Sequence, residues 1–263
     1  MKKTISLIFT AVLILSLCSC GKTEDSGGKL PLLTVETQNY KEDFPGENGE
    51  IICSLDMDYP VFESKDIPDI AGKISSALEY VKAETIERIK ANLESTADAK
   101  KRFNLTGVTV TKVTFEVYAN TPYVVSVSMT EKTGTVPEDD EGVIKGYSFS
   151  LADGSKLTHE TLASPNAVKL DETLMKIIGQ QADRSYSPNG IALGKEQREK
   201  LDKLYSPDNF CCDDTGIAFL YSYRILSSGS RGGTYFCKVN WSLLRNTLIS
   251  PREYYERLNP PVA

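Results

Sequence analysis

The sequence predicts an α+β fold: a mainly antiparallel sheet with a long N-terminal helix and a C-terminal meander plus short helices. Two segments, 123–129 and 145–151, alternate residues in the way that strands with two distinct faces do. A longer segment, 67–93, instead places apolar residues three and four positions apart, which is typical of a helix with one buried stripe. Runs of strands interleaved with separate helices indicate the α+β class.

The N-terminal elements follow from local composition. Segments 32–40 and 50–59 have strand composition and are separated by the turn sequence Phe-Pro-Gly-Glu-Asn-Gly. We expect Pro60 to end the second strand, because proline cannot donate a hydrogen bond to a sheet. After the helix, segment 107–118 is rich in valine and shows a phase change in its apolar pattern. That change predicts a bulge or burial on both faces of the strand.

Later elements complete the expected order. Asp153-Gly154 predicts a tight turn into a short strand at 156–158. Further helices are expected at 166–182 and 195–204, followed by strands at 209–212, 216–224 and 233–240 that form a meander. A final helix is expected near the C-terminus, with Ser250 at the N-cap, Pro251 at the first position and Glu253 at the third. We expect it to end near Leu258.

The first nineteen residues predict a lipoprotein signal peptide. A basic start precedes an apolar stretch, from Ile5 to Leu17, that is shorter than the roughly 20 residues a spanning helix needs. The sequence Leu-Cys-Ser-Cys that ends at Cys20 matches a lipobox, in which the last cysteine is lipidated. We therefore expect a lipid anchor on Cys20 that holds the chain on the cell membrane or outer membrane, outside the cytoplasm. An ordinary secretory signal is the alternative.

The signal peptide comprises residues 1–19. The rest of the chain divides into three parts. Residues 20–31 are polar and glycine-rich, which is typical of a flexible tether. Residues 32–160 form an N-terminal α+β half, and residues 161–263 form a C-terminal α+β half. This length is sufficient to bury a sizeable core.

Composition and motifs exclude several classes of function. The chain has 36 acidic and 30 basic residues and a net charge of −6, with one tryptophan and one histidine, which argues against nucleic acid as a partner. It contains no nucleophile elbow, phosphate loop, dinucleotide fingerprint or zinc-helix motif, so no catalytic residue, cofactor or metal ligand is assigned. The acidic segment 138–141 is either a calcium site or, as its ligand spacing favours, a solvated hairpin tip.

Four cysteines follow the lipobox, at positions 53, 211, 212 and 237. An even number in an exported protein permits two disulfides in three possible pairings. Cys211 and Cys212 point to opposite faces of a strand, and Cys237 is expected two strands away from Cys212. That separation of roughly 9–10 Å exceeds disulfide reach. Free, buried thiols therefore remain an alternative to bridges.

The C-terminal strands resemble a known domain family. The sequence of residues 210–225, Phe-Cys-Cys-Asp-Asp-Thr-Gly-Ile-Ala-Phe-Leu-Tyr-Ser-Tyr-Arg-Ile, is similar to strands in the extracellular domain that the anti-sigma factor RsiV shares with some peptidoglycan deacetylases. The hairpin at 148–158 and the long helix also occupy the places they have in that family. Arg224 departs from it, because the family prefers an acidic residue there.

The resemblance implies a non-catalytic binding module that recognises a lysozyme-like protein or peptidoglycan. The candidate ligand-binding residues are Tyr221, Tyr223, Arg224 and Tyr235, since tyrosine is enriched at interfaces. Core packing is the alternative for each tyrosine, and the same choice applies to Tyr254 and Tyr255. Two competing functions remain: an envelope hydrolase that uses carboxylates such as Asp213 and Asp214, and a structural lipoprotein without a small ligand. A catalytic base is conceivable at His159, and a surface or capping histidine is the alternative.

Overall fold

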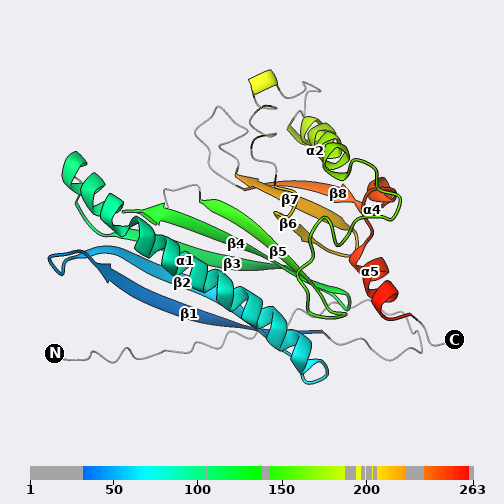
Figure 1. Cartoon of the computed structure of the whole chain (residues 1–263), viewed down its shortest axis with the longest axis horizontal. Helices are drawn as coiled ribbons and strands as arrows, with labels where there is room; N and C mark the ends of the chain where they lie inside the picture. Colours follow the sequence, from blue (N-terminus) through cyan, green and yellow to red (C-terminus); the bar gives the residue numbers. More distant parts are fainter. Residues whose placement is uncertain are drawn as a thin grey trace.

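The structure, a computed structural model, describes residues 32–104, 106–137, 142–186, 194–196, 199, 203, 206–222 and 234–260. Figure 1 shows a long helix lying across a five-stranded sheet, with a three-stranded sheet beside that sheet and a further helix over the smaller one. The architecture is α+β with mainly antiparallel pairing, as the sequence predicts.

The elements have the following bounds. The strands are β1 (Thr34–Pro45), β2 (Ile51–Glu63), β3 (Thr109–Asn120), β4 (Val124–Gly134), β5 (Val143–Ser150), β6 (Phe210–Cys212), β7 (Gly216–Ser222) and β8 (Thr234–Asn240). The helices are α1 (Pro68–Phe103), α2 (Leu170–Tyr186), α4 (Trp241–Leu244) and α5 (Pro251–Leu258). The sheet orders are β1-β2-β3-β4-β5 and β6-β7-β8. Strands β2 and β3 pair in parallel, because α1 connects them as a crossover.

Three N-terminal elements are longer than the sequence predicts. Strand β1, expected to end at residue 40, continues to Pro45 in its pairing with β2. Strand β2 does not end at Pro60 but continues to Glu63, and its pairing with β3 stops at Met57. Beyond Met57 no strand of the described residues pairs with this side of β2, which is an edge position that proline tolerates. Helix α1 extends past residue 93 to Phe103, and the Lys100 ammonium contacts the Ile52 carbonyl oxygen at 3.2 Å.

Both faces of the five-stranded sheet are covered where β4 runs. Val125, Val127 and Met129 belong to one core with α1, whereas the alternate residues Val124 and Ser126 are buried on the opposite face. The predicted alternation in β4 is therefore confirmed, and its second side faces another layer of protein. In β3 a bulge occurs between Val117 and Ala119 and leaves Tyr118 without a pairing position.

The second layer begins with β6, whose free edge lies against serines of β4 and β5. The Ser126 hydroxyl accepts a hydrogen bond from the Cys212 N–H at 3.2 Å and lies 2.7 Å from the Cys212 carbonyl oxygen. The Ser148 hydroxyl lies 3.4 Å from the Phe210 carbonyl oxygen. Buried backbone groups at a strand edge need such partners, because leaving them unpaired costs stability.

Asn209 joins the outer edge of β5 to the smaller sheet. Its side-chain oxygen accepts from the Gly146 N–H at 2.8 Å, and its amide nitrogen donates to the carbonyl oxygens of Ile144 at 3.1 Å and Leu220 at 3.0 Å. One side chain thus takes the place of a short stretch of strand along β5. The arrangement fixes where β6 starts relative to the larger sheet.

The second core lies between the smaller sheet and α2. Register places Ile217 opposite Val239 and Phe219 opposite Cys237, so the apolar sides of β7 and β8 form one face. That face packs with Ile178 of α2. The thiols of all four cysteines within the described residues, at 53, 211, 212 and 237, are free and buried.

The remaining predicted elements have mixed outcomes. The turn at Asp153-Gly154 is present, with Gly154 at φ +77°, but it leads into a single bridge at Lys156 rather than a strand. Helix α2 begins at Leu170 instead of 166, because the preceding residues form turns. The capping box of α5 at Ser250 is confirmed. Most of the helix expected at 195–204 lies outside the described residues.

Candidate functional site

The four residues that the sequence suggests for ligand binding do not form an exposed surface within the described residues. Tyr221 is only 4% exposed and belongs to the core between the smaller sheet and α2. It therefore packs in the interior, as the alternative interpretation predicts. Tyr223 and Arg224 lie outside the described residues. The backbone of Tyr235 in β8 pairs opposite Tyr221. Cys20 and the acidic segment 138–141 also lie outside the described residues.

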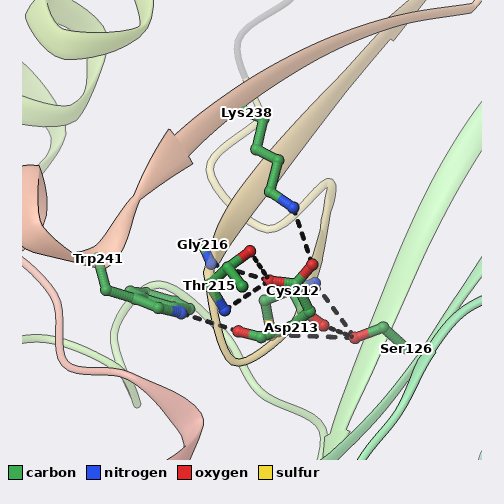
Figure 2. Close-up of polar contacts among 7 residues, drawn as sticks. All are labelled: Ser126, Cys212, Asp213, Thr215, Gly216, Lys238 and Trp241. Atoms are coloured by element: carbon green, nitrogen blue, oxygen red, sulfur yellow. Dashed lines mark hydrogen bonds and ion pairs between the residues drawn. The ribbon is translucent and has the colours of Figure 1, made fainter. Parts of the chain in front are cut away.

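A dense polar cluster instead surrounds Asp213, in the turn between β6 and β7. Its Oδ1 atom accepts hydrogen bonds from the Thr215 N–H at 2.7 Å, the Thr215 hydroxyl at 2.6 Å and the Gly216 N–H at 2.9 Å. Aspartate favours such turns because its short side chain bonds the backbone two residues ahead. Figure 2 shows these bonds converging on one carboxylate oxygen.

Two further side chains hold the same aspartate from β8 and α4. The Lys238 ammonium lies 2.8 Å from Asp213 Oδ2, and the Trp241 indole N–H donates to the Asp213 carbonyl oxygen at 2.8 Å (Figure 2). Burial raises the pKa of Asp213, but the hydrogen bonds from Lys238 and Thr215 outweigh it and leave the pKa below its usual value. A lowered pKa disfavours the protonated form that a general acid needs, and both carboxylate oxygens are already engaged, so Asp213 is also poorly suited to act as a nucleophile.

Aromatic rings from other parts of the chain gather near this turn. Tyr118 is the bulge residue of β3 that has no pairing position in β4. The Lys238 ammonium lies over its ring, 5.8 Å from the ring centre. Thr121 donates its hydroxyl hydrogen to Asp214 Oδ1 at 3.2 Å and so ties the β3–β4 turn to the β6–β7 turn. Burial raises the pKa of Tyr118 by more than the nearby Lys238 lowers it, so the net shift is upward.

The C-terminal helix adds a second aromatic pair. The Tyr123 and Tyr255 rings meet edge to face with centroids 5.5 Å apart, and the Arg252 guanidinium lies 5.7 Å from the Tyr123 ring centre. Four segments that are distant in sequence therefore meet around the β6–β7 turn, and we call this group of residues the aromatic corner. It comprises Tyr118, Thr121, Tyr123, Asp213, Asp214, Thr215, Lys238, Trp241, Arg252 and Tyr255.

His159, the sole histidine of the chain, is buried and contacts two more exposed carboxylates away from the corner. Its Nδ1 lies 2.9 Å from Asp208 Oδ1, and its Nε2 lies 3.3 Å from Asp171 Oδ1. Burial raises the pKa of Asp208, but its hydrogen bonds with His159 lower the pKa by more, so the net shift is downward. Each ring nitrogen faces a carboxylate rather than a hydroxyl or thiol, which suits a structural link between α2 and the segment before β6 better than a catalytic base.

Other described features carry little chemistry. No group of three His, Cys, Asp or Glu side chains in the described ranges could hold a metal ion. No helix within those ranges is long and apolar enough to cross a membrane. A hollow of about 340 Å³ lies where β2 ends and α1 begins, lined by residues such as Phe62, Glu63, Lys65 and Pro68. It is open to solvent, and its lining combines the polar residues Thr34, Glu63, Ser64 and Lys65 with apolar ones.

Fold and site together define a two-sheet α+β domain with an exposed aromatic and charged surface. No protein-family model matches the chain, and no curated protein matches it. Similar solved structures include two DUF3298 family proteins. One is a member of the DUF3298 family from Bacteroides fragilis, with 14% identity, a TM-score of 0.52 and coverage of 86% of this chain and 97% of that chain.

The other is a DUF3298 family protein from Pseudomonas aeruginosa, with 13% identity, a TM-score of 0.53 and coverage of 83% of this chain and 95% of that chain. Identities this low show a shared fold alone. The chain thus has a fold like that of DUF3298 proteins, which fits an RsiV-like domain at the level of architecture.

Proposed function

We propose that this protein is a lipoprotein of the cell envelope, anchored through Cys20 to the cell membrane or outer membrane. Outside the cytoplasm it acts as a non-catalytic binding module that recognises a lysozyme-like protein or peptidoglycan. The lipobox that ends at Cys20 supports the anchor. The family resemblance of residues 210–225 supports the type of ligand, and the likeness to DUF3298 proteins is compatible with it.

The observation that carries the binding role is the composition of the aromatic corner. Tyrosine, tryptophan and arginine are the side chains that most often supply binding energy at interfaces. One of the two carboxylates considered for hydrolysis, Asp213, is instead used in the fold. Asp213 is held by Lys238 and Thr215, and Asp208 is held by His159. This favours recognition over the competing role as an envelope hydrolase.

Binding is tested by calorimetry on the full chain in detergent micelles, with hen-type lysozyme and soluble peptidoglycan fragments as separate probes. We expect saturable heat with at least one probe. If a folded sample binds neither, the binding role is wrong. Mass spectrometry of the peptidoglycan fragments after long incubation checks the alternative, since a hydrolase would shorten them and an Asp213→Ala, Asp214→Ala double variant would not.

The anchor has its own test, independent of the ligand. The Cys20→Ala variant is expected to leave the membrane fraction and to lack the mass of the attached lipid, because the thiol is the acylated group. A Ser19→Ala variant retains a small residue before the cysteine and serves as the control. A Cys20→Ala protein that stays in the membrane fraction with wild-type mass would contradict the proposal.

A further inference from the structure

We propose that the aromatic corner is the ligand-binding site and that its ligand is a glycan chain. The inference rests on the proposed function and deepens it: it selects the glycan of peptidoglycan over a protein partner and names the surface that contacts it. Three properties of the corner support this choice: its rings, its charges and its rigidity.

The rings are presented in a form that suits sugars. Tyr118, Tyr123, Trp241 and Tyr255 are each partly buried, so part of each side chain is held by the protein and part reaches solvent. Aromatic side chains bury a large area with few rotatable bonds, which lowers the entropic cost of binding. The C–H faces of a pyranose ring pack well on such flat apolar surfaces. The Tyr123 and Tyr255 rings, with centroids 5.5 Å apart, can together contact neighbouring sugars of a chain.

Three of the four charged groups of the corner, Asp213, Lys238 and Arg252, are paired within the protein, and Asp214 accepts a hydrogen bond from Thr121. Lys238 lies 2.8 Å from Asp213, and the Arg252 guanidinium donates to Glu256 at 2.8 Å. A highly charged partner is attracted by unpaired groups of opposite sign, and pairing reduces that attraction. A ligand rich in hydroxyl groups has no such requirement. The corner therefore fits a saccharide better than a strongly basic protein.

Exposed acceptors complete the surface. Asp214 and Thr215 are both exposed at the tip of the β6–β7 turn, beside the rings. Sugar hydroxyls donate to carboxylate oxygens and exchange hydrogen bonds with threonine hydroxyls. The Asp214 carboxylate is positioned by the Thr121 hydroxyl, 3.2 Å away. A few fixed polar groups among aromatic side chains are typical of small-ligand recognition.

The corner is also organised before any ligand binds. The Trp241 indole is tied to the Asp213 carbonyl oxygen, and Asp213 is itself held by four further contacts from Thr215, Gly216 and Lys238. A surface that is already in place loses little conformational entropy on binding.

Trp241 is the only tryptophan of the chain, so its fluorescence reports on this surface directly. The experiment titrates the full chain, in detergent micelles, with soluble peptidoglycan glycan strands freed of their peptide stems. A parallel titration uses hen-type lysozyme. We expect a saturable fluorescence change with the glycan. Tyr123→Ala and Tyr255→Ala should each weaken binding about tenfold, which corresponds to about 1.4 kcal/mol.

Two further variants separate binding from folding. Tyr80→Ala changes a tyrosine on α1 that is 65% exposed, and it should bind as the wild type does. Asp214→Asn keeps the rings and an exposed polar group, so it should weaken glycan binding without lowering the melting temperature.

Each other outcome has a distinct meaning. Glycan binding that is unchanged in the corner variants overturns the inference and leaves the proposed function intact. Lysozyme binding that the corner variants weaken, without glycan binding, makes the corner a protein interface and also overturns the inference. Failure of both probes with a folded wild type removes the inference and the proposed function together.

Discussion

Replacing Gly146 in β5 by alanine should strongly destabilise the junction of the two sheets. A Cβ atom at this position would lie 2.4 Å from both the carbonyl carbon and the oxygen of Phe210, and 2.9 Å from Leu220 Cδ1. Carbon atoms prefer separations of about 3.5–4.0 Å, so the β6 backbone would have to move by about 1 Å. That movement would strain the hydrogen bond between the Gly146 N–H and the Asn209 side chain, now 2.8 Å long.

The expected cost combines two effects. Overpacking of a closely packed interior costs about 1–3 kcal/mol, and loss of the hydrogen bond adds about 1 kcal/mol. Taking a total of about 3 kcal/mol, and about 2–4 °C for each kcal/mol in a domain of this size, the melting temperature should fall by roughly 6–12 °C. Thermal unfolding followed by far-ultraviolet circular dichroism measures the change, and urea unfolding gives the free energy.

Gly72→Ala provides the matched control. Gly72 lies in α1, and no heavy atom would come within 4 Å of its added Cβ. Alanine at an unobstructed helix position stabilises by about 1 kcal/mol relative to glycine, so this variant should melt slightly above the wild type. If Gly146→Ala melted as high as Gly72→Ala, the close approach of β6 to β5 described above would be wrong.

Three further predictions concern the same junction and its chemistry. Ser126→Ala should lower the free energy of unfolding by about 1–3 kcal/mol, measured by urea unfolding, because it leaves the backbone groups of Cys212 without their partner. The control Ser95→Ala changes an exposed serine of α1 and should stay within about 0.5 kcal/mol of the wild type. The folded-state pKa of Asp213 is lowered, so its contribution to stability is present above the unfolded pKa near 4 and is lost as pH falls through the folded value. Asp213→Asn should therefore be less stable than the wild type at pH 7, with a shallower loss of stability below about pH 4 in acid titrations; equal slopes would count against the ion pair. Burial raises the pKa of the Cys212 and Cys237 thiols to about 12, so both should react with a thiol reagent at pH 8 only after denaturation, and rapid labelling of either in the native protein would contradict their burial.

Local pattern was sufficient for much of the fold and insufficient for the ends of elements. The two sides of β4 and the capping box at Ser250 follow from periodicity and local side-chain chemistry, both of which act within a few residues. Helix α1 passes the predicted end because distant contacts hold its last turns, among them the one between Lys100 and the Ile52 carbonyl. The sequence predicts that the second strand ends at Pro60, but a proline ends a strand only where a partner strand needs its missing N–H.

The candidate site was harder to predict, for a reason that Tyr221 and Tyr123 illustrate. Both tyrosines border or lie in strands with clear alternation, yet one is buried in the second core and the other is partly exposed beside α5. Alternation says which residues share a face and does not say which later segment covers that face. Asp213 was considered as a hydrolytic carboxylate, although the sequence Asp-Asp-Thr-Gly is also turn chemistry. The structure uses the aspartate for the turn.

The position of the aromatic corner follows from the way β6 is attached to the larger sheet. Gly146 lets the β6 backbone approach, and the Ser126 hydroxyl bonds that backbone at Cys212, immediately before Asp213. The turn that follows is thereby brought beside the β3–β4 turn, where Thr121 contacts Asp214. The bulge at Tyr118 then allows its ring to reach Lys238 rather than continue the strand pairing. A small, polar surface on β4 and β5 thus has a structural purpose, because bulkier side chains there would separate the turns that bring the aromatic rings together.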